Sequence, residues 1–346
     1  MRFRPIKLVS TLAVLPCLSL FLSAIARAAS DTTPPDRQRD FRFTYHSEIS
    51  LAEIGGIAPM AKHVEAWIPL PREDAFQHVT TLEVDTPVHH EIVDQNHNRN
   101  RVLHLDASAP LPASIPVTVR FGVKRIEETA NLERAQRNIP EPSGGKFAEF
   151  LGPDKLVPLD GRIAQVSDKL GDETASPYQQ AQIIYEYVVG VMAYDKTGTG
   201  WGRGDALYAC DVRRGNCTDF HALFIALARS RGIPARFTIG FPIGAAKSGQ
   251  TGQIPGYHCW AEFYAGGEWI PLDASEAWKN PARHAYYFGH LDAARVAFTM
   301  GRDLALTPRQ QGEPLNYLIY PYVEVDGKAL PKESIKNHFE YANVAE

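Results

Sequence analysis

The sequence contains few cysteines and no large excess of charge of either sign. Its 346 residues include only 4 Cys, and 36 Lys and Arg stand against 40 Asp and Glu without any long basic block. A small disulfide-stapled scaffold and a nucleic-acid binder are therefore both excluded. Glycine and proline, at 26 and 25 residues, follow no period, which excludes collagen-like and low-complexity chains. The remaining class is a globular protein, in agreement with a hydrophobic content of 44%.

The longest apolar run lies at the N-terminus. Basic residues near the start precede the apolar segment from Leu8 to Ile25, and Ala26-Arg27-Ala28 follows it. This order is typical of a secretory signal peptide with an A-x-A cleavage site. We expect cleavage after residues 1–28, a linker over residues 29–40, and a periplasmic or secreted protein without a stable membrane span. An uncleaved membrane anchor is the alternative.

Two kinds of hydrophobic periodicity divide the rest of the chain. Apolar residues recur at every second position from Phe41 to about residue 127, which is typical of half-buried strands. Proline and glycine then cluster between residues 139 and 145, and helical spacing follows. We therefore expect an antiparallel β-sandwich-like domain over residues 41–135 and an α+β domain over residues 145–346.

The second domain contains two helix starts. Ser176 and Pro177 are typical of an N-cap and a first-turn proline. A glycine-rich loop over residues 195–216 leads to a second helix that begins at Cys217. Strands are expected over residues 235–241, 257–264 and 268–273.

Three residues in these segments fit nucleophilic catalysis. A thiol in the first turn of a helix lies beside unpaired backbone N–H groups, and these favour the thiolate form of Cys217. His258, on an otherwise apolar strand, is the candidate base, and Asp273, at the end of the next strand, is the candidate group that orients it. A two-residue turn at Gly266-Gly267 would place both side chains on one face of the hairpin, whereas a three-residue turn would separate them.

Residues 176–277 resemble the transglutaminase-like superfamily, whose fold is a papain-like cysteine-enzyme core. The resemblance rests on blocks in the family's order, which are GNCTDFH at residues 215–221, IPARFTIGF at 233–241, GYHCWAEFY at 256–264 and WIPLD at 269–273. It implies that Cys217 is the nucleophile, that His258 is the general base and acid, and that Asp273 orients the imidazole. The segment AWIPLP at residues 66–71 is also similar to an N-terminal module of bacterial exported members.

The residues beside the nucleophile differ from those of one branch of this family. Animal protein-crosslinking transglutaminases carry GQCW, whereas Asn216 and Thr218 flank Cys217 here. We therefore expect thiol-dependent hydrolysis of an amide bond in a protein, a peptide or the cell wall, with neither a nucleic-acid partner nor a cofactor. Transfer of a glutamine acyl group to an amine, and a catalytically silent binding module on the same fold, are the alternatives.

Further residues have two interpretations each. Trp201, between two glycines, is a candidate substrate-binding residue or a packing anchor. Cys210 and Cys259 are either a disulfide or two packed thiols. We expect no metal site, because His258 and Cys259, as neighbours on a strand, point to opposite faces and no C-x-x-C pair is present.

Overall fold

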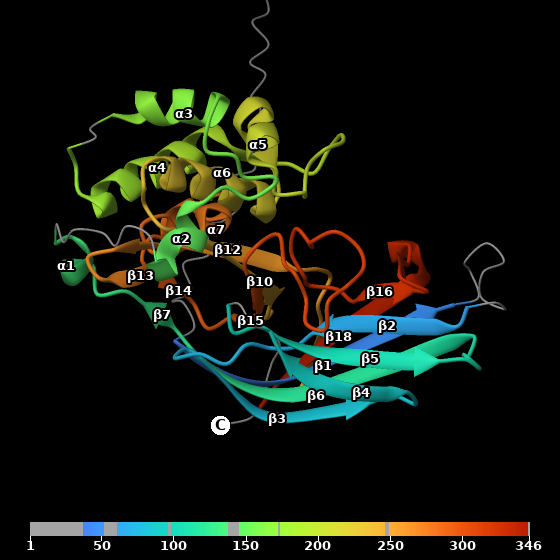
Figure 1. The fold of residues 1–346 in the computed structure, drawn as a ribbon. Coiled ribbons are helices and arrows are strands. Elements are labelled where there is room, and N and C mark those ends of the chain that lie inside the picture. Colours follow the sequence, from blue (N-terminus) through green and yellow to red (C-terminus); the bar gives the residue numbers. More distant parts are fainter. Residues whose placement is uncertain are drawn as a thin grey trace, which may run out of the picture.

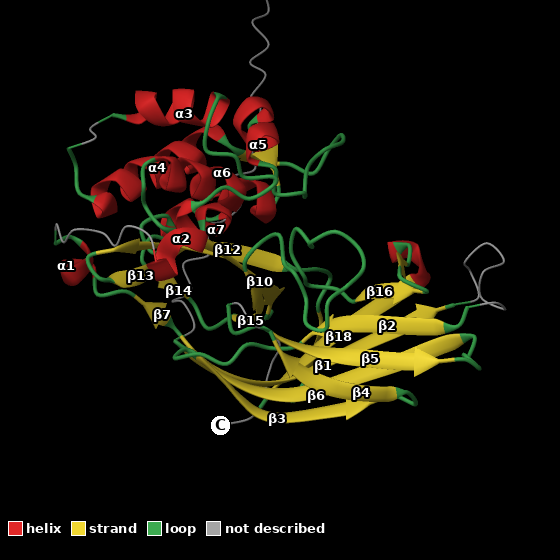
Figure 2. Cartoon of the chain, in the orientation of Figure 1, coloured by secondary structure: helices red, strands yellow, loops and turns green. Residues whose placement is uncertain are grey.

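The computed structural model describes residues 37–51, 61–95, 98–137, 145–171, 174–245 and 249–344. One half of the molecule is built of long strands, and the other half contains most of the helices above a smaller sheet (Figures 1 and 2). The predicted signal peptide, residues 1–28, and most of the predicted linker lie outside the described residues. Within the described ranges, no helix is long and apolar enough to cross a membrane.

The strand-rich half consists of two five-stranded antiparallel sheets. One sheet has the order β11-β18-β1-β6-β3, and the other has the order β17-β16-β2-β5-β4. Their N-terminal strands are β1 (Gln38–Ser50), β2 (His63–Pro69), β3 (Gln77–Asp85), β4 (His89–Asp94), β5 (Arg101–Ser108) and β6 (Ser114–Ile126). Buried residues alternate with less buried ones along β1 and β6, so the prediction of half-buried strands is confirmed.

The C-terminal part of the chain returns to these sheets. The strands involved are β11 (Thr251–Gln253), β16 (Tyr322–Val325), β17 (Lys328–Ala329) and β18 (Ile335–Asn343). β18 pairs with β1 from Phe41↔Asn343 to Ile49↔Ile335, and β16 pairs with β2. The range 145–346 thus supplies strands to both halves, unlike the predicted division. β18 and β16 supply the hydrogen-bonding partners that one edge of β1 and of β2 would otherwise lack.

The second half has a four-stranded antiparallel sheet of the order β13-β12-β10-β15. Its strands are β10 (Ala235–Pro242), β12 (His258–Ala265), β13 (Glu268–Leu272) and β15 (Arg295–Met300). Helix α6 (Cys217–Ser230) packs on β12 and β10 and is itself covered by α4 (Pro177–Val191) and α5 (Ala206–Val212). This mixed architecture confirms the predicted α+β class.

The two halves share one hydrophobic core. Phe298 of β15 lies with its ring centroid 5.7 Å from that of Phe43 in β1 and 5.8 Å from that of Phe121 in β6. Phe241 of β10 lies 5.1 Å from Phe298 and 4.4 Å from Phe339 of β18. These aromatic contacts bury both sheets against each other, so the orientation of the halves is set by apolar packing.

Short elements complete the described chain. They are β7 (Glu128–Thr129), α1 (Leu132–Ala135), α2 (Ala148–Leu151), α3 (Arg162–Ser167), β8 (Ala193–Tyr194), β9 (Arg214–Gly215), α7 (Ala274–Lys279) and β14 (His290–Leu291), with 3₁₀ turns at Gly145–Phe147, Asp168–Leu170, Pro281–Arg283 and Lys332–Ser334. β7 pairs with β14, and β8 pairs with β9 in parallel.

Candidate active site

Helix α6 begins at Cys217, as predicted. Asn216 is its N-cap, and its side-chain oxygen accepts hydrogen bonds from the backbone N of Thr218 at 3.0 Å and from the Thr218 hydroxyl at 2.6 Å. Asp219 completes a capping box by accepting from the backbone N of Asn216 at 3.0 Å. The thiol therefore lies in a defined first turn, where helical N–H groups without intrahelical partners surround it.

The Asp219 carboxylate also ties the glycine-rich loop to this turn. It accepts hydrogen bonds from the backbone N–H groups of Gly202 at 2.7 Å and Gly204 at 3.0 Å. Gly215 approaches the same carboxylate so closely that an added Cβ would lie 2.2 Å from Oδ2 of Asp219. The sequence thus places a buried acid, with glycines around it, two residues after Cys217 in the first turn of α6.

His258 and Asp273 meet at the end of the hairpin formed by β12 and β13. Nε2 of His258 lies 2.6 Å from Oδ2 of Asp273. The Cys217 thiol hydrogen-bonds with the same imidazole ring, and Nδ1 is the ring nitrogen left for that contact. The pairs Ala265↔Glu268 and Ala261↔Leu272 confirm the register of a two-residue turn at Gly266-Gly267. Asp273 itself lies beyond β13, as the N-cap of α7.

Four hydrogen bonds fix the Asp273 carboxylate, which is fully buried. Oδ2 accepts from His258 and, at 3.0 Å, from Nη1 of Arg295. Oδ1 accepts from the Ser275 hydroxyl and from the backbone N of Glu276, both at 3.0 Å. A buried carboxylate held in this way keeps its charge and fixes the orientation of the imidazole.

The local charges favour an ion pair between Cys217 and His258. Burial raises the pKa of the Cys217 thiol. Hydrogen bonds with Cys259 and His258 and the positive charge of His258 lower it, and together they outweigh burial, so that this pKa lies well below the ordinary value. Burial lowers the pKa of His258, whereas the charge and the hydrogen bond of Asp273 raise it to about 10. A thiolate and an imidazolium therefore coexist around neutral pH.

Comparison with known proteins agrees with this geometry. A family model described as the transglutaminase-like superfamily matches residues 164–274. Residues 164–274 form a transglutaminase-like core. The matched range contains Cys217, His258 and Asp273 and ends before Arg295.

Similar chains cover more of the protein. A Haemophilus influenzae protein described as uncharacterized is 29% identical over 307 residues, which cover 77% of this chain and 83% of that protein. An uncharacterized Mycobacterium leprae protein is 29% identical over 133 residues, covering 36% of this chain and 44% of its own. A crystal structure from Cytophaga hutchinsonii, described as a candidate cysteine protease, has a TM-score of 0.63 at 18% identity and covers 90% of this chain and 93% of its own. The whole fold, including the strand-rich half, is thus shared with that structure.

The other predicted cysteines occupy different surroundings in the transglutaminase-like core. Cys210, Cys217 and Cys259 are all free thiols. Cys259 hydrogen-bonds with Cys217, and its sulfur lies 3.6 Å from Nδ1 of His221, whereas Cys210 lies on α5. Cys210 and Cys259 are therefore not joined by a disulfide, which was one of the two interpretations of this pair. Among the described residues, no group of three or more His, Cys, Asp or Glu side chains could hold a metal ion.

His221 is a second histidine close to Cys217. Its Nδ1 lies 2.7 Å from the carbonyl oxygen of Cys217, and its Nε2 accepts from the backbone N of Ala274 at 3.2 Å. Because Nε2 accepts, the ring proton is on Nδ1 and is donated to that carbonyl. Burial lowers the pKa of His221. It is therefore a neutral residue that connects α6 to α7.

Trp201 lies in the loop that Asp219 binds. Its Nε1 donates to the carbonyl oxygen of Gly198 at 3.2 Å, and the residue after it, Gly202, donates its N–H to Asp219. The loop is therefore anchored at the first turn of α6. The assignment of Trp201 as a substrate-binding residue stays a prediction.

The sequence analysis missed two groups at this site. Arg295 contacts Asp273 and also lies with its guanidinium carbon 5.0 Å from the centre of the Trp260 ring. An isolated arginine at the start of the apolar segment Arg295-Val296-Ala297-Phe298 was the signal that could have indicated it. Tyr257 is the other group, because its hydroxyl accepts from Nδ2 of the N-cap Asn216 at 2.9 Å.

A cavity of about 620 Å³ lies near the glycine-rich loop. It is lined mainly by apolar and aromatic side chains, among them Tyr317 and Tyr320, together with Arg203. The Tyr317 hydroxyl donates to the carbonyl oxygen of Gly202 at 2.9 Å, and the Tyr257 ring lies 6.1 Å from that of Tyr317. This cavity is therefore connected to the start of α6 by a row of tyrosines.

The cap of α6 is expected to contribute measurably to stability. Replacing Asn216 with Ala removes the acceptor of Thr218, so the free energy of unfolding should fall by about 1–2 kcal/mol. Asn216→Ser keeps an N-cap acceptor and serves as the matched control, with a smaller loss. Denaturant unfolding followed by circular dichroism measures both values. Equal stability of the wild type and Asn216→Ala would show that the cap contributes nothing.

Proposed function

We propose that this protein is a cysteine hydrolase that cleaves amide bonds in peptides or proteins. The observation that carries the proposal is the buried chain from Cys217 through His258 to Asp273, with a lowered thiol pKa and a raised imidazole pKa. The transglutaminase-like core and the similarity to a candidate cysteine protease fold support the same chemistry. Cell-wall amides belong to the same proposed substrate class.

In the proposed reaction, the Cys217 thiolate attacks the amide carbonyl carbon and the carbonyl oxygen becomes an oxyanion. Cys217 is the first residue of α6, and its backbone N–H, which has no intrahelical partner, donates to that oxygen. The His258 imidazolium protonates the leaving nitrogen as the C–N bond breaks, which leaves a thioester on Cys217. Neutral His258 then takes a proton from water, whose oxygen attacks the thioester carbonyl carbon. The C–S bond breaks, which releases the carboxylic acid and regenerates the Cys217 thiolate and the His258 imidazolium.

Water is the proposed acceptor rather than an amine. The basis is the sequence beside the nucleophile, where Asn216 and Thr218 replace the Gln and Trp of protein-crosslinking members. We also propose that the tyrosine-lined cavity receives the acyl part of the substrate, because it is apolar and connected to the start of α6, and that Trp201, in the loop before the lining residue Arg203, contacts the substrate. Export to the periplasm or the medium is proposed from the N-terminal segment of residues 1–28.

An activated ester tests the acyl-enzyme without knowledge of the substrate. With p-nitrophenyl acetate, we expect a burst of nitrophenolate, a transient acetyl group on Cys217 by peptide mass spectrometry, and acetate that carries oxygen-18 when the water is labelled. Cys217→Ala should abolish all three signals, whereas Cys210→Ala, at an equally buried thiol, should keep them.

The acceptor is decided in the same experiment by adding cadaverine. Labelled acetate as the main product is the expected result, and N-acetylcadaverine as the main product would instead establish amine transfer. Ester cleavage at the wild-type rate in Cys217→Ala would overturn the proposed nucleophile.

A further inference from the structure

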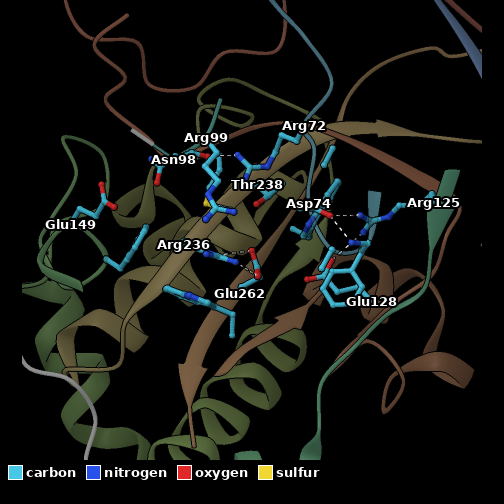
Figure 3. Close-up of a pocket in the computed structure, with 17 residues that line it drawn as sticks. Arg72, Asp74, Asn98, Arg99, Arg125, Glu128, Glu149, Arg236, Thr238 and Glu262 are labelled. Atoms are coloured by element: carbon cyan, nitrogen blue, oxygen red, sulfur yellow. Dashed lines mark hydrogen bonds and ion pairs between the residues drawn. The ribbon is translucent and has the colours of Figure 1, made fainter. Parts of the chain in front are cut away.

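A second cavity, of about 700 Å³, lies between the strand-rich half and the four-stranded sheet (Figure 3). Its walls include Arg236 and Thr238 of β10, Trp260 and Glu262 of β12, and the segment after β2 that contains Arg72. Cys259 of β12 points toward α6, and adjacent strand residues face opposite sides of a sheet. The cavity therefore lies on the face of the sheet that is turned away from α6. Neither Cys217 nor Asp273 lines it.

The charges in this cavity are unevenly compensated. Arg236 forms a bidentate pair with Glu262 through contacts of 2.8 Å and 2.5 Å. Arg125 contacts Glu128 at 3.1 Å and Asp74 at 3.8 Å. These two arginines thus pair with the carboxylates of Glu262, Glu128 and Asp74, and the remaining carboxylate of the lining, that of Glu149, is exposed.

Two further arginines of the lining form no ion pair with any carboxylate in the part of the chain that the structure describes. Arg72, which is 5% exposed, donates from Nη1 to the carbonyl oxygen of Asn98 and, at 2.9 Å, to Oδ1 of Asn100, both of which are neutral. Arg99 is exposed, and its side chain has no hydrogen bond or ion pair with any residue that the structure describes. Burial lowers the pKa of Arg72, as expected for a cation removed from water without full compensation.

The cavity lining also includes a buried hydroxyl group, that of Thr238. Oγ1 of Thr238 has no hydrogen-bond partner among the described residues, although the side chain is 3% exposed. A buried polar group without a partner is destabilising, so this hydroxyl is free to hydrogen-bond with a molecule in the cavity. Thr238, Arg72 and Arg99 all line this cavity, and Figure 3 labels the three among its walls, together with the Arg236–Glu262 pair.

The remaining walls are aromatic. Trp260, Trp269, Phe76 and Phe150 line the cavity, and they provide apolar surface beside the two uncompensated cations. Small-molecule sites commonly combine such apolar walls with a few fixed polar groups. The arrangement suits a molecule with one oxyanion group and a flat apolar body.

We propose that this cavity binds a small organic anion whose oxyanion group lies between Arg72 and Arg99 and accepts a hydrogen bond from Thr238. The oxyanion is a carboxylate or a phosphate, since a guanidinium pairs with either. This binding site is separate from the proposed acyl-enzyme chemistry and does not depend on it. Trp260 lies between this cavity and the candidate active site, because it lines the cavity and its ring lies 6.2 Å from that of His258.

Calorimetric titration of the full-length protein with three matched ligands tests the proposal. Phenyl phosphate and benzoate share a ring and differ in the oxyanion, and benzamide is the neutral control. We expect saturable binding of at least one of the two anions, weakened by added salt, and no binding of benzamide. Tighter binding of phenyl phosphate or of benzoate shows whether the cavity prefers a phosphate or a carboxylate.

Two variants locate the bound anion. Arg99→Gln changes an exposed side chain, and Thr238→Val keeps the shape while removing the unpartnered hydroxyl, so both should fold. We expect each to weaken binding of the preferred anion by about tenfold. Arg42→Gln, at an exposed arginine of β1 outside the cavity, is the matched control and should bind as the wild type does.

Thr238→Val has a second readout. Because the Thr238 hydroxyl has no partner among the described residues, its removal should leave the stability of the ligand-free protein unchanged or raise it. Absence of saturable anion binding, equal binding of benzamide, or wild-type affinity in both Arg99→Gln and Thr238→Val would overturn the proposal.

Discussion

Iodoacetamide is expected to label Cys217 far faster than the other two thiols of the native protein at pH 6. All three thiols are buried, with exposures of 2% for Cys210, 2% for Cys217 and 0% for Cys259. The reagent therefore reaches the three to a similar degree, and the labelling rates should differ because the thiols differ in ionisation. The pKa of Cys217 lies well below the ordinary value, while burial raises that of Cys210 and that of Cys259. Since an ordinary thiol is less than about 1% ionised at pH 6, a difference on the order of 100-fold is expected.

The labelling rates are read for each cysteine by peptide mass spectrometry across a range of pH. His258→Ala removes the positive charge and a hydrogen bond that stabilise the thiolate, so labelling of Cys217 should require a higher pH in this variant. Labelling after unfolding in denaturant provides the control, because all three thiols should then react alike. Uniformly slow labelling of the native protein would contradict the proposed thiolate and favour a catalytically silent module.

Asp273→Asn is expected to have the second large effect, on both turnover and stability. Turnover of p-nitrophenyl acetate should fall by about 10²- to 10⁴-fold, because the imidazolium loses its counter-charge and the ring loses its orienting acceptor. Labelling of Cys217 should move to higher pH for the same reason. Arg295 is left buried beside a neutral amide, which should lower the free energy of unfolding by about 3 kcal/mol.

The pH dependence of this stability loss follows from the two pKa shifts. Burial raises the pKa of Asp273, but His258 and Arg295 lower it well below its ordinary value of 3.8, so its contribution is lost as the pH falls below about that value. His258 has its pKa raised from 6.5 to about 10, so its contribution is complete below 6.5 and is lost as the pH rises toward 10. The difference between wild type and Asp273→Asn should therefore be largest near pH 5 and smaller at pH 9.

Asp292→Asn is the matched control for this experiment. Asp292 contacts Arg295 at 3.5 Å and the Tyr287 hydroxyl at 3.0 Å, but none of its contacts reaches His258. We expect it to destabilise the fold while leaving the pH profile of Cys217 labelling unchanged. A similar shift of that profile in both variants would mean that general destabilisation, not the loss of the His258 partner, causes the effect.

The local features of the site were predictable from the sequence. Asn216 caps a helix that begins at Cys217, and Ser176 caps α4, since both caps depend only on residues within one turn. The register of the hairpin at Gly266-Gly267 follows from a two-residue turn in the same way. The approach of His258 to Asp273 could be predicted because a hairpin connects them.

Contacts between distant parts of the chain were decided by the tertiary structure. Arg295 lies 22 residues after Asp273, and no local pattern joins the two; the pairing follows from β15 adding to the far edge of β10. Cys259 lies against Cys217 rather than Cys210 because β12 passes under the first turn of α6.

The overall architecture also has a part that follows from local sequence and a part that depends on contacts between distant segments. The alternation of apolar residues by itself determined that the N-terminal part forms half-buried strands, since burial of one face sets the side-chain period. Only the tertiary structure decided that β16 and β18 complete the two sheets and that a cavity forms between the halves. Strand pairing depends on unpaired backbone edges that meet in space, and one sequence carries no record of which edges will meet.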